Sequence, residues 1–103
     1  MSRYVLTAEA QQDLRAIHDY LIAEGGARVA LHVVSAFIVA FRRLSKSPGM
    51  GHRREDLTSH ENLLFWPVFS YVIVYMRGSE PLKVVAVLHG NRDVARLLRE
   101  RPL

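Results

Sequence analysis

The 103-residue chain contains no cysteine, which excludes a disulfide framework and a thiolate metal site. Its first ten residues, MSRYVLTAEA, contain no apolar signal region. The longest apolar run, Val33 to Phe41, is far shorter than the ~20 residues that a transmembrane helix needs. We therefore expect one cytoplasmic domain over residues 1–103, with no membrane partner and with enough chain to bury its own core.

The usual signatures of catalysis and metal binding are also missing. The chain has no Gly-rich phosphate loop, no GxSxG and no HExxH sequence, and its serines have no recognisable base partner. The five histidines include no i, i+4 pair of the kind that forms a helical zinc site; they are His18, His32, His52, His60 and His89. We expect neither a nucleophilic hydrolase nor a bound metal or other cofactor.

Positive charge is in excess. Fourteen Lys and Arg face ten Asp and Glu, which gives a net charge of +4 and a pI near 10.0. This balance fits an anionic partner, either a nucleic acid or an acidic protein. Ordinary surface charge that maintains solubility explains the same numbers equally well, so charge alone does not choose between them.

The first half of the chain is typical of a short strand followed by two helices. Residues 3–6 (RYVL) are β-prone, and Thr7 can cap a helix that Gly25 and Gly26 end. Apolar residues recur at helical spacing before these glycines and again over residues 27–44. The second segment contains the β-branched stretch VVSAFIVAF, but it runs too long without Gly or Pro for a strand. A helical hairpin is predicted.

The second half of the chain contains three apolar runs of strand length, Leu63–Val68, Tyr71–Met76 and Leu82–Leu88. Pro67 places the first run at a sheet edge or at a bulge, and the almost wholly apolar third run predicts a central strand. RGSEP between the last two runs predicts a hairpin turn. The order β-α-α-β-β-β, with a possible short C-terminal helix around residues 94–98, predicts a two-layer α+β fold. In this fold the helical hairpin packs on an antiparallel sheet.

The segment LHGNRD is the most chemically suggestive. It places His89, Arg92 and Asp93 just after the predicted central strand, where functional loops often lie. A histidine can act as a general acid or base near neutral pH, and an arginine can hold a phosphate. The residues alone favour a structural interpretation, in which Asp93 caps the tail helix, Arg92 pairs with a carboxylate and His89 fills the end of the sheet.

Other side chains are candidates for contact with a partner. The aromatic residues Trp66, Tyr71 and Tyr75 could stack on bases or fill an interface. Alternation along a strand favours the core for most of them, and we expect at most one to face a partner. Arg96 and Arg99 belong to the amphipathic tail, which is expected to dock on the fold or on a partner.

The stretch SPGMGHRREDL joins the two halves of the chain. Pro48 and Gly49 stop the helix, and the whole connection, about residues 45–62, is longer than most structureless loops. Arg53 or Arg54 can pair with Glu55 or Asp56, and Leu57 can anchor the loop on the core. We interpret the segment as a mainly structural joint whose two arginines are also candidate partner contacts.

With YVLTAEAQQDLRAIHDYL, SPGMGHRREDL, FWPVFSYVIVY and LHGNRDVARLL in this order, the chain resembles the ParE-like branch of the RelE/ParE toxins. These are the toxin halves of bacterial type II toxin–antitoxin modules, once called plasmid stabilisation proteins. The resemblance implies one toxin domain that binds and poisons DNA gyrase and arrests growth, without a cofactor. It also implies a cognate antitoxin, usually acidic, that lays an extended segment and a helix over the sheet and helical hairpin.

The same resemblance leaves two alternatives. The RelE-like branch cleaves mRNA on the ribosome with basic residues on its middle strands, where this chain has Leu63, Phe65 and Val72. Of that ribonuclease set only Arg92 remains, with His89 nearby, so a gyrase poison is favoured over an endonuclease. Direct contact with nucleic acid is expected only for the endonuclease. The other alternative is a non-toxic module that serves only to bind an antitoxin.

Overall fold

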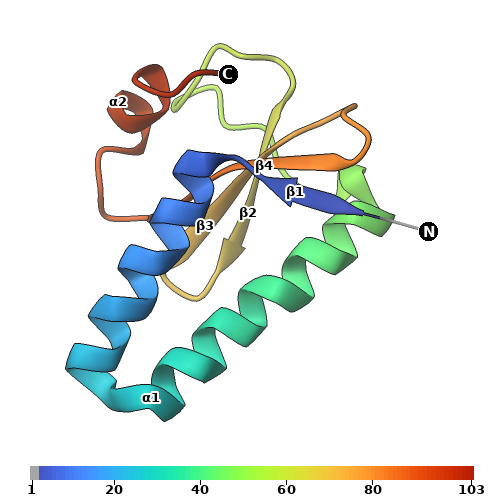
Figure 1. Cartoon of the computed structure of the whole chain (residues 1–103). Coiled ribbons are helices and arrows are strands. Elements are labelled where there is room, and N and C mark those ends of the chain that lie inside the picture. The colour runs from blue at the N-terminus through green and yellow to red at the C-terminus, as the bar shows by residue number, and fades with distance from the viewer. Residues whose placement is uncertain (1–2) are drawn as a thin grey trace.

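The computed structural model describes residues 3–103 and shows a helical hairpin packed on one face of a four-stranded sheet (Figure 1). The predicted α+β architecture is confirmed, including the short helix near the C-terminus. The elements in chain order are β1 (Tyr4–Leu6), α1 (Ala8–Lys46), a 3₁₀ turn (Pro48–Met50), β2 (Leu63–Val68), β3 (Tyr71–Met76), β4 (Leu82–His89) and α2 (Val94–Arg99).

Helix α1 folds back on itself at Gly26. Its first turn is capped by Thr7, whose hydroxyl oxygen accepts a hydrogen bond from Ala10 N at 3.1 Å. Gly26 has φ 85° and ψ 174°, a conformation that side-chain-bearing residues rarely adopt. The helix therefore breaks into a first arm (residues 8–25) and a second arm (27–46), as Figure 1 shows. The predicted helical hairpin is confirmed.

The two arms turn their apolar sides to the sheet and form the main core. Buried side chains of the second arm pack against the sheet, among them Phe37, Phe41 and Leu44. By length and composition alone, α1 resembles a membrane-spanning helix, as core helices of globular proteins also do. Here the apolar side of the helix is used to cover the sheet.

The strands are arranged in the order β1-β4-β3-β2. The predictions that β4 is central and that β2, with Pro67, is an edge strand are confirmed. β2, β3 and β4 pair antiparallel, but β1 pairs in parallel with β4, with Tyr4 opposite Leu82. The sheet is therefore mixed. The predicted antiparallel arrangement holds for β2, β3 and β4. Because the chain reverses once between β2 and β3 and again between β3 and β4, β4 runs in the same direction as β2, and β1 also runs in that direction.

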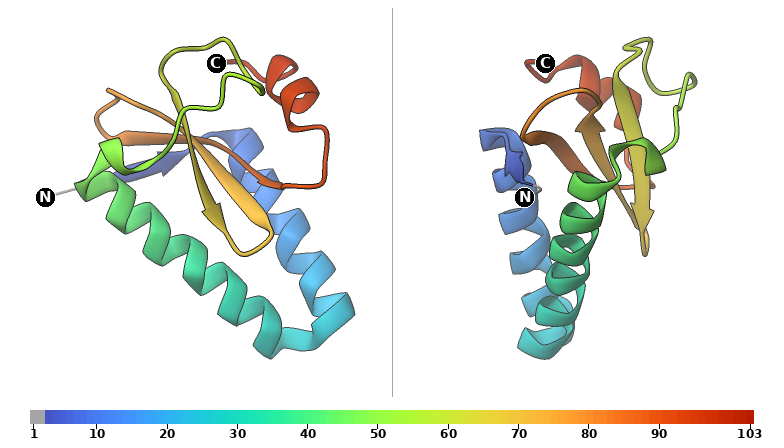
Figure 2. Two further views of the ribbon diagram at one scale, coloured as in Figure 1. Left: turned by 180° about the vertical axis from the view of Figure 1, so that it is seen from behind. Right: turned by 90° about the vertical axis from the view of Figure 1, so that its right-hand side faces the viewer.

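The second face of the sheet is covered by α2 and by the connection between α1 and β2. Val94 and Leu98 of α2 pack there on buried strand residues, and Leu57 anchors the connection, as predicted. Asp93 caps α2, its Oδ1 accepting from Arg96 N at 3.2 Å. The edge-on view in Figure 2 shows the helical hairpin on one side of the strands and α2 near one end of the sheet.

An ion pair completes the exposed edge of β4. β1 covers only the first half of this edge, and beyond it Val87 N donates to Asp13 Oδ2 at 3.0 Å, while Val85 O accepts from Arg101 Nη1 at 2.9 Å. Arg101 and Asp13 also form a double hydrogen bond, at 2.7 and 2.8 Å, which raises the pKa of Arg101. Because both side chains are largely buried, the pair takes the place of a missing strand.

The joint between α1 and β2 is fixed by one tyrosine. The Tyr75 hydroxyl donates to Pro48 O at 2.6 Å and accepts from Gly51 N at 2.9 Å. A Cβ at position 51 would lie 2.5 Å from this hydroxyl oxygen, so only glycine fits. Two hydrogen bonds of 2.8 Å between His52 and Phe65 then continue the connection along the outer edge of β2.

We predict that Asp13→Ala lowers the free energy of unfolding by about 2–4 kcal/mol, because Arg101 and Val87 N lose their partner in a mostly buried place. Urea denaturation would measure the loss. Arg96→Ala is the control, since it removes only solvent-exposed ion pairs and should cost less than about 1 kcal/mol. Equal losses in the two variants would contradict the special role of Asp13.

We predict that Tyr75→Phe lowers the free energy of unfolding by about 1–3 kcal/mol, because Pro48 O and Gly51 N are left unsatisfied. Faster hydrogen exchange at the Gly51 amide would locate the damage in the joint. Tyr20→Phe, at an exposed tyrosine, is the matched control and should change neither measurement. An unchanged Gly51 exchange rate in Tyr75→Phe would show that the hydroxyl does not hold the joint.

Candidate partner-binding surface

The loop after β4 brings the two candidate catalytic residues to one end of the sheet. His89 ends β4, and Arg92 follows in the turn before α2. The ring of His89 meets that of Tyr71 edge-on, with centroids 5.2 Å apart. Gly90 N donates to Ser70 O at 2.8 Å. The loop after β4 and the β2–β3 turn therefore form one connected end of the sheet.

A hollow of about 550 Å³ opens beside this end, between the first arm of α1 and the sheet. We call it the His89 hollow. His89 and Arg92 both line it, so the structure brings them together as predicted. Tyr20 of α1 and Tyr71 of β3 also line it, and burial, followed by the nearby Tyr20, raises the pKa of Tyr71. Its size and largely apolar lining are those of a pocket for a ligand or for an anchoring side chain.

The hydrogen bonds around His89 limit its use as a base. Its Nδ1 accepts from Asn91 N at 3.1 Å, so the neutral ring carries its proton on Nε2. In that form Nε2 donates a hydrogen bond and has no lone pair with which to take a proton. Asp13 also lines the hollow, but Arg101 and Val87 N already engage its carboxylate. The arrangement suits recognition of an acceptor better than proton abstraction.

The arginines near the C-terminus differ in their surroundings. Arg96 pairs with Asp93 at 3.6 Å and with Glu100 at 3.1 Å. Arg92 and Arg99 have no carboxylate partner within the described residues 3–103, so the predicted pairing of Arg92 is not found. Their charges are therefore available to a partner, whereas that of Arg96 is largely offset.

The two arginines of the joint form the predicted local ion pairs. Arg54 makes two hydrogen bonds to Asp56, at 2.8 and 2.9 Å, which raise the pKa of Arg54 and lower that of Asp56. Arg53 lies 3.8 Å from Glu55. All four side chains are exposed, so these pairs contribute little to stability and offset the charge that would attract an anionic partner.

The three aromatic candidates separate by burial. Tyr75 is fully buried and bonded to the joint, so it is not the one of the three candidates that could face a partner in this conformation. Trp66 is partly exposed and stacks on His52, with ring centroids 6.1 Å apart. Tyr71 is also partly buried, between the His89 hollow and a second hollow.

This second hollow, of about 360 Å³, adjoins the same end of the sheet. We call it the His52 hollow; His52 and Arg54 line it together with the apolar side chains of Phe65, Pro67 and Phe69. It shares Ser70 and Tyr71 with the His89 hollow. The β2–β3 turn therefore stands between two depressions.

The places where a RelE-like ribonuclease is expected to carry basic residues are closed by apolar packing. Leu63 and Phe65 are buried, and Val72 packs partly buried beside them under Leu57 and α2. Among residues 3–103, no group of three His, Asp or Glu is arranged to hold a metal. At these three positions no side chain offers charge to a pentavalent phosphate, and Arg54, which lines the His52 hollow beside Phe65 and Val72, is paired with Asp56.

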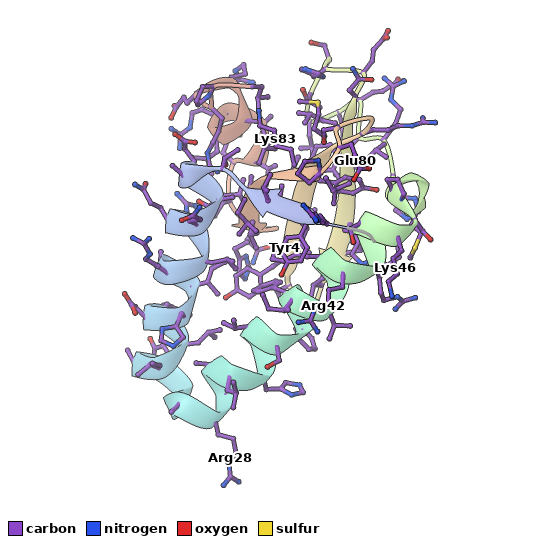
Figure 3. The ribbon with its side chains drawn as sticks, turned by 45° about the vertical axis from the view of Figure 1, so that its right-hand side comes forward. Tyr4, Arg28, Arg42, Lys46, Glu80 and Lys83 are labelled. Atoms are coloured by element: carbon purple, nitrogen blue, oxygen red, sulfur yellow. The ribbon has the colours of Figure 1, made fainter. Side chains whose placement is uncertain are left out.

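A third hollow, of about 390 Å³, is basic. Arg3 from the start of β1 and Arg42 and Lys46 from the end of α1 line it, with Tyr4 and Ser45 between them. Figure 3 shows Arg42 and Lys46 near Tyr4, and Arg28 far away at the opposite end of the second arm. No carboxylate of residues 3–103 pairs with these three cations. We call this site the basic hollow.

The basic hollow adjoins the free edge of β1. Arg3 O and Thr7 N bond to β4, so by alternation the backbone groups of Tyr4 and Leu6 face away from the sheet. Only Leu6 O among these has a partner in residues 3–103, Gln11 Nε2 at 3.2 Å. An edge of this kind can pair with an extended segment of another chain.

Sequence reasoning missed the basic hollow and the β2–β3 turn. Cations in the last turn of a helix suit its dipole, and nothing local indicates that Arg3 lies beside them. A usable pattern did exist at the turn: only Phe69 and Ser70 separate two strand-length runs, where Gly or Asn is usual.

Comparison with known proteins gives the family. The family described as ParE toxin of type II toxin-antitoxin system, parDE, matches residues 4–94. Toxin ParE of Escherichia coli is 32% identical over 101 residues, which cover 98% of this chain and 97% of the relative. A chain of the Chromosomal ParDE TA system from P. aeruginosa has the same fold, with a TM-score of 0.71 at 16% identity over 86% of this chain and 96% of the other. The protein thus belongs to the ParE toxin family of type II toxin–antitoxin systems.

Proposed function

We propose that this ParE-type toxin arrests growth by binding and poisoning DNA gyrase, and that a cognate antitoxin neutralises it in the cytoplasm. The observation that carries the proposal is that Leu63, Phe65 and Val72 place buried or partly buried apolar side chains where a ribonuclease would need charge. A toxin without a catalytic set must act by binding, and two hollows at one end of the sheet offer a surface for this.

The endonuclease alternative has one observation in its favour, because His89 and Arg92 line the same hollow. Phosphodiester cleavage needs a base, an acid and stabilisation of the developing charge. His89 donates through Nε2 in its neutral form, and Arg92 would have to supply the charge alone. The binding function is therefore the better supported of the two.

The basic hollow supports the antitoxin part of the proposal. Three unpaired cations there match an acidic segment, and the adjoining edge of β1 can accept one in extended form. The family itself places this chain in a two-protein module. A non-toxic module that only binds an antitoxin would make the same contacts. Growth arrest in the absence of antitoxin is therefore the measurement that distinguishes a toxin from such a module.

We predict that the purified toxin inhibits supercoiling by gyrase and traps cleaved DNA. Arg92→Ala should weaken this inhibition by less than about 10-fold, as expected for a charge at the rim of an interface. Removal of a catalytic group would instead cost about 10²–10⁴-fold. Supercoiling assays on plasmid DNA with both proteins provide the measurement.

Primer extension on translated mRNA completes the test of this function. Codon-phased cuts that appear with the wild-type protein and disappear in Arg92→Ala would establish the endonuclease and overturn the gyrase proposal. Absence of growth arrest on induction without antitoxin would leave only the non-toxic binding module.

We predict that the double variant Arg42→Ala, Lys46→Ala binds the antitoxin encoded beside it about 10-fold more weakly, because two charges of the basic hollow are lost. Arg28→Ala is the matched control: it removes an exposed cation from the same arm, far from the hollow. Titration at two salt concentrations should show a smaller salt dependence in the double variant. Equal affinities in all three proteins would place the antitoxin elsewhere.

A further inference from the structure

The β2–β3 turn has an unfavourable backbone. Val68 pairs with Tyr71, so the turn consists of Phe69 and Ser70 alone. Phe69 has φ 55°, the only positive φ at a non-glycine residue in the described part of the chain. Two-residue hairpin turns with a positive φ at their first residue normally use glycine there, because a side chain is strained in that conformation. A bulky aromatic residue is a poor choice for folding.

The side chain of Phe69 makes few contacts that could offset the free-energy cost of this strain. It is 63% exposed, and its ring leans on that of His32 in the second arm of α1, with centroids 5.7 Å apart. Burial of a phenylalanine would contribute favourably to folding, but most of this ring remains in water. The backbone conformation at this position therefore costs stability, and the side chain offsets little of that cost.

The surroundings hold the ring in a defined place. Gly90 N donates to Ser70 O at 2.8 Å, and a Cβ at position 90 would approach that oxygen to 3.3 Å. The turn is thus packed closely against the loop after β4. Phe69 lines the His52 hollow, and its neighbour Ser70 lines both that hollow and the His89 hollow, so the turn lies where the two depressions adjoin.

We propose that Phe69 is the anchor by which the toxin grips its protein target, inserting its ring into an apolar cavity of that target. This inference rests on the proposed function, that the toxin acts by binding a protein. Strain retained at an exposed aromatic residue is the mark of a site that serves a partner. A largely exposed aromatic side chain at the rim of a depression has the form of an interface hot spot. Arg92, without an ion pair, supplies a cationic rim that fits acidic groups around the target's cavity.

The chemistry around the turn favours a protein over a nucleic acid. A base-stacking platform needs a basic groove that follows the phosphate backbone. The His52 hollow contains one arginine, Arg54, and its charge is offset by a double hydrogen bond to Asp56. The rest of that hollow is largely apolar, as at Phe65 and Pro67.

The test is the substitution Phe69→Asn, because asparagine tolerates positive φ and lacks the ring. We expect the melting temperature to rise by about 4–8 °C as the strain is relieved. We expect inhibition of gyrase to weaken by at least about 30-fold, as for a hot-spot residue, and growth arrest to be lost. Capture of the antitoxin should remain unchanged. A higher melting temperature together with a loss of growth arrest would distinguish a partner contact from a structural role, because replacement of a structural residue would lower the melting temperature.

Two controls accompany this variant. Phe69→Tyr keeps the ring and the strain, so inhibition should stay within about 3-fold of wild type with no gain in melting temperature. Val39→Asn removes an apolar side chain that is 54% exposed in the second arm of α1, and should leave inhibition unchanged.

Several results would overturn the anchor. The Phe69→Asn variant would contradict the proposal if its melting temperature were lower than or equal to that of the wild type. It would also do so if it still arrested growth, or if it lost antitoxin capture together with toxicity. Binding of a labelled DNA duplex that depends on Phe69 would point to a nucleic acid instead. If wild-type toxin arrests growth without inhibiting gyrase, the proposed target fails separately. Loss of arrest in Phe69→Asn would then still support an anchor for another protein.

Discussion

The hydrogen-bonding needs of β4 determine how the rest of the molecule is arranged. β3 satisfies one edge of this central strand, but β1 is only three residues long and covers half of the other. Beyond β1, Asp13 supplies an acceptor to Val87 N and Arg101 supplies a donor to Val85 O, so the first turns of α1 and the segment after α2 meet at that edge. One unsatisfied strand edge thus fixes the position of both helical layers.

The fold could be predicted where its causes are local. Gly25 and Gly26 interrupt a helical pattern, and Pro67 cannot donate to a sheet, so the hairpin and the edge strand follow from the sequence. The parallel pairing of β1 could not be predicted, because three residues contain no pattern that orients a strand. Asp13 and Arg101 are 88 positions apart, and no periodicity connects them.

The same distinction applies to the surface. His89 and Arg92 belong to one loop, and the sequence was sufficient to place them together. Alternation favoured the core for most of the aromatic candidates, and Tyr75 lies there, but alternation gives the face of a strand and could not say which candidate stays exposed. The basic hollow depends on the meeting of a strand and a helix end about 40 residues apart in the chain. Candidate binding surfaces of this kind are therefore set mainly by tertiary geometry.

The parallel pairing of β1 with β4 has a consequence for the order of folding. Tyr4 meets Leu82, which lies 78 positions later in the chain, so the first strand waits for the last. Contacts of such separation form late because their loop-closure entropy must be met first. During synthesis the helical hairpin is made long before the strand that completes its sheet. The nascent chain must therefore carry an exposed apolar helix pair until β4 is translated, and an early-binding partner would act on this state as a chaperone.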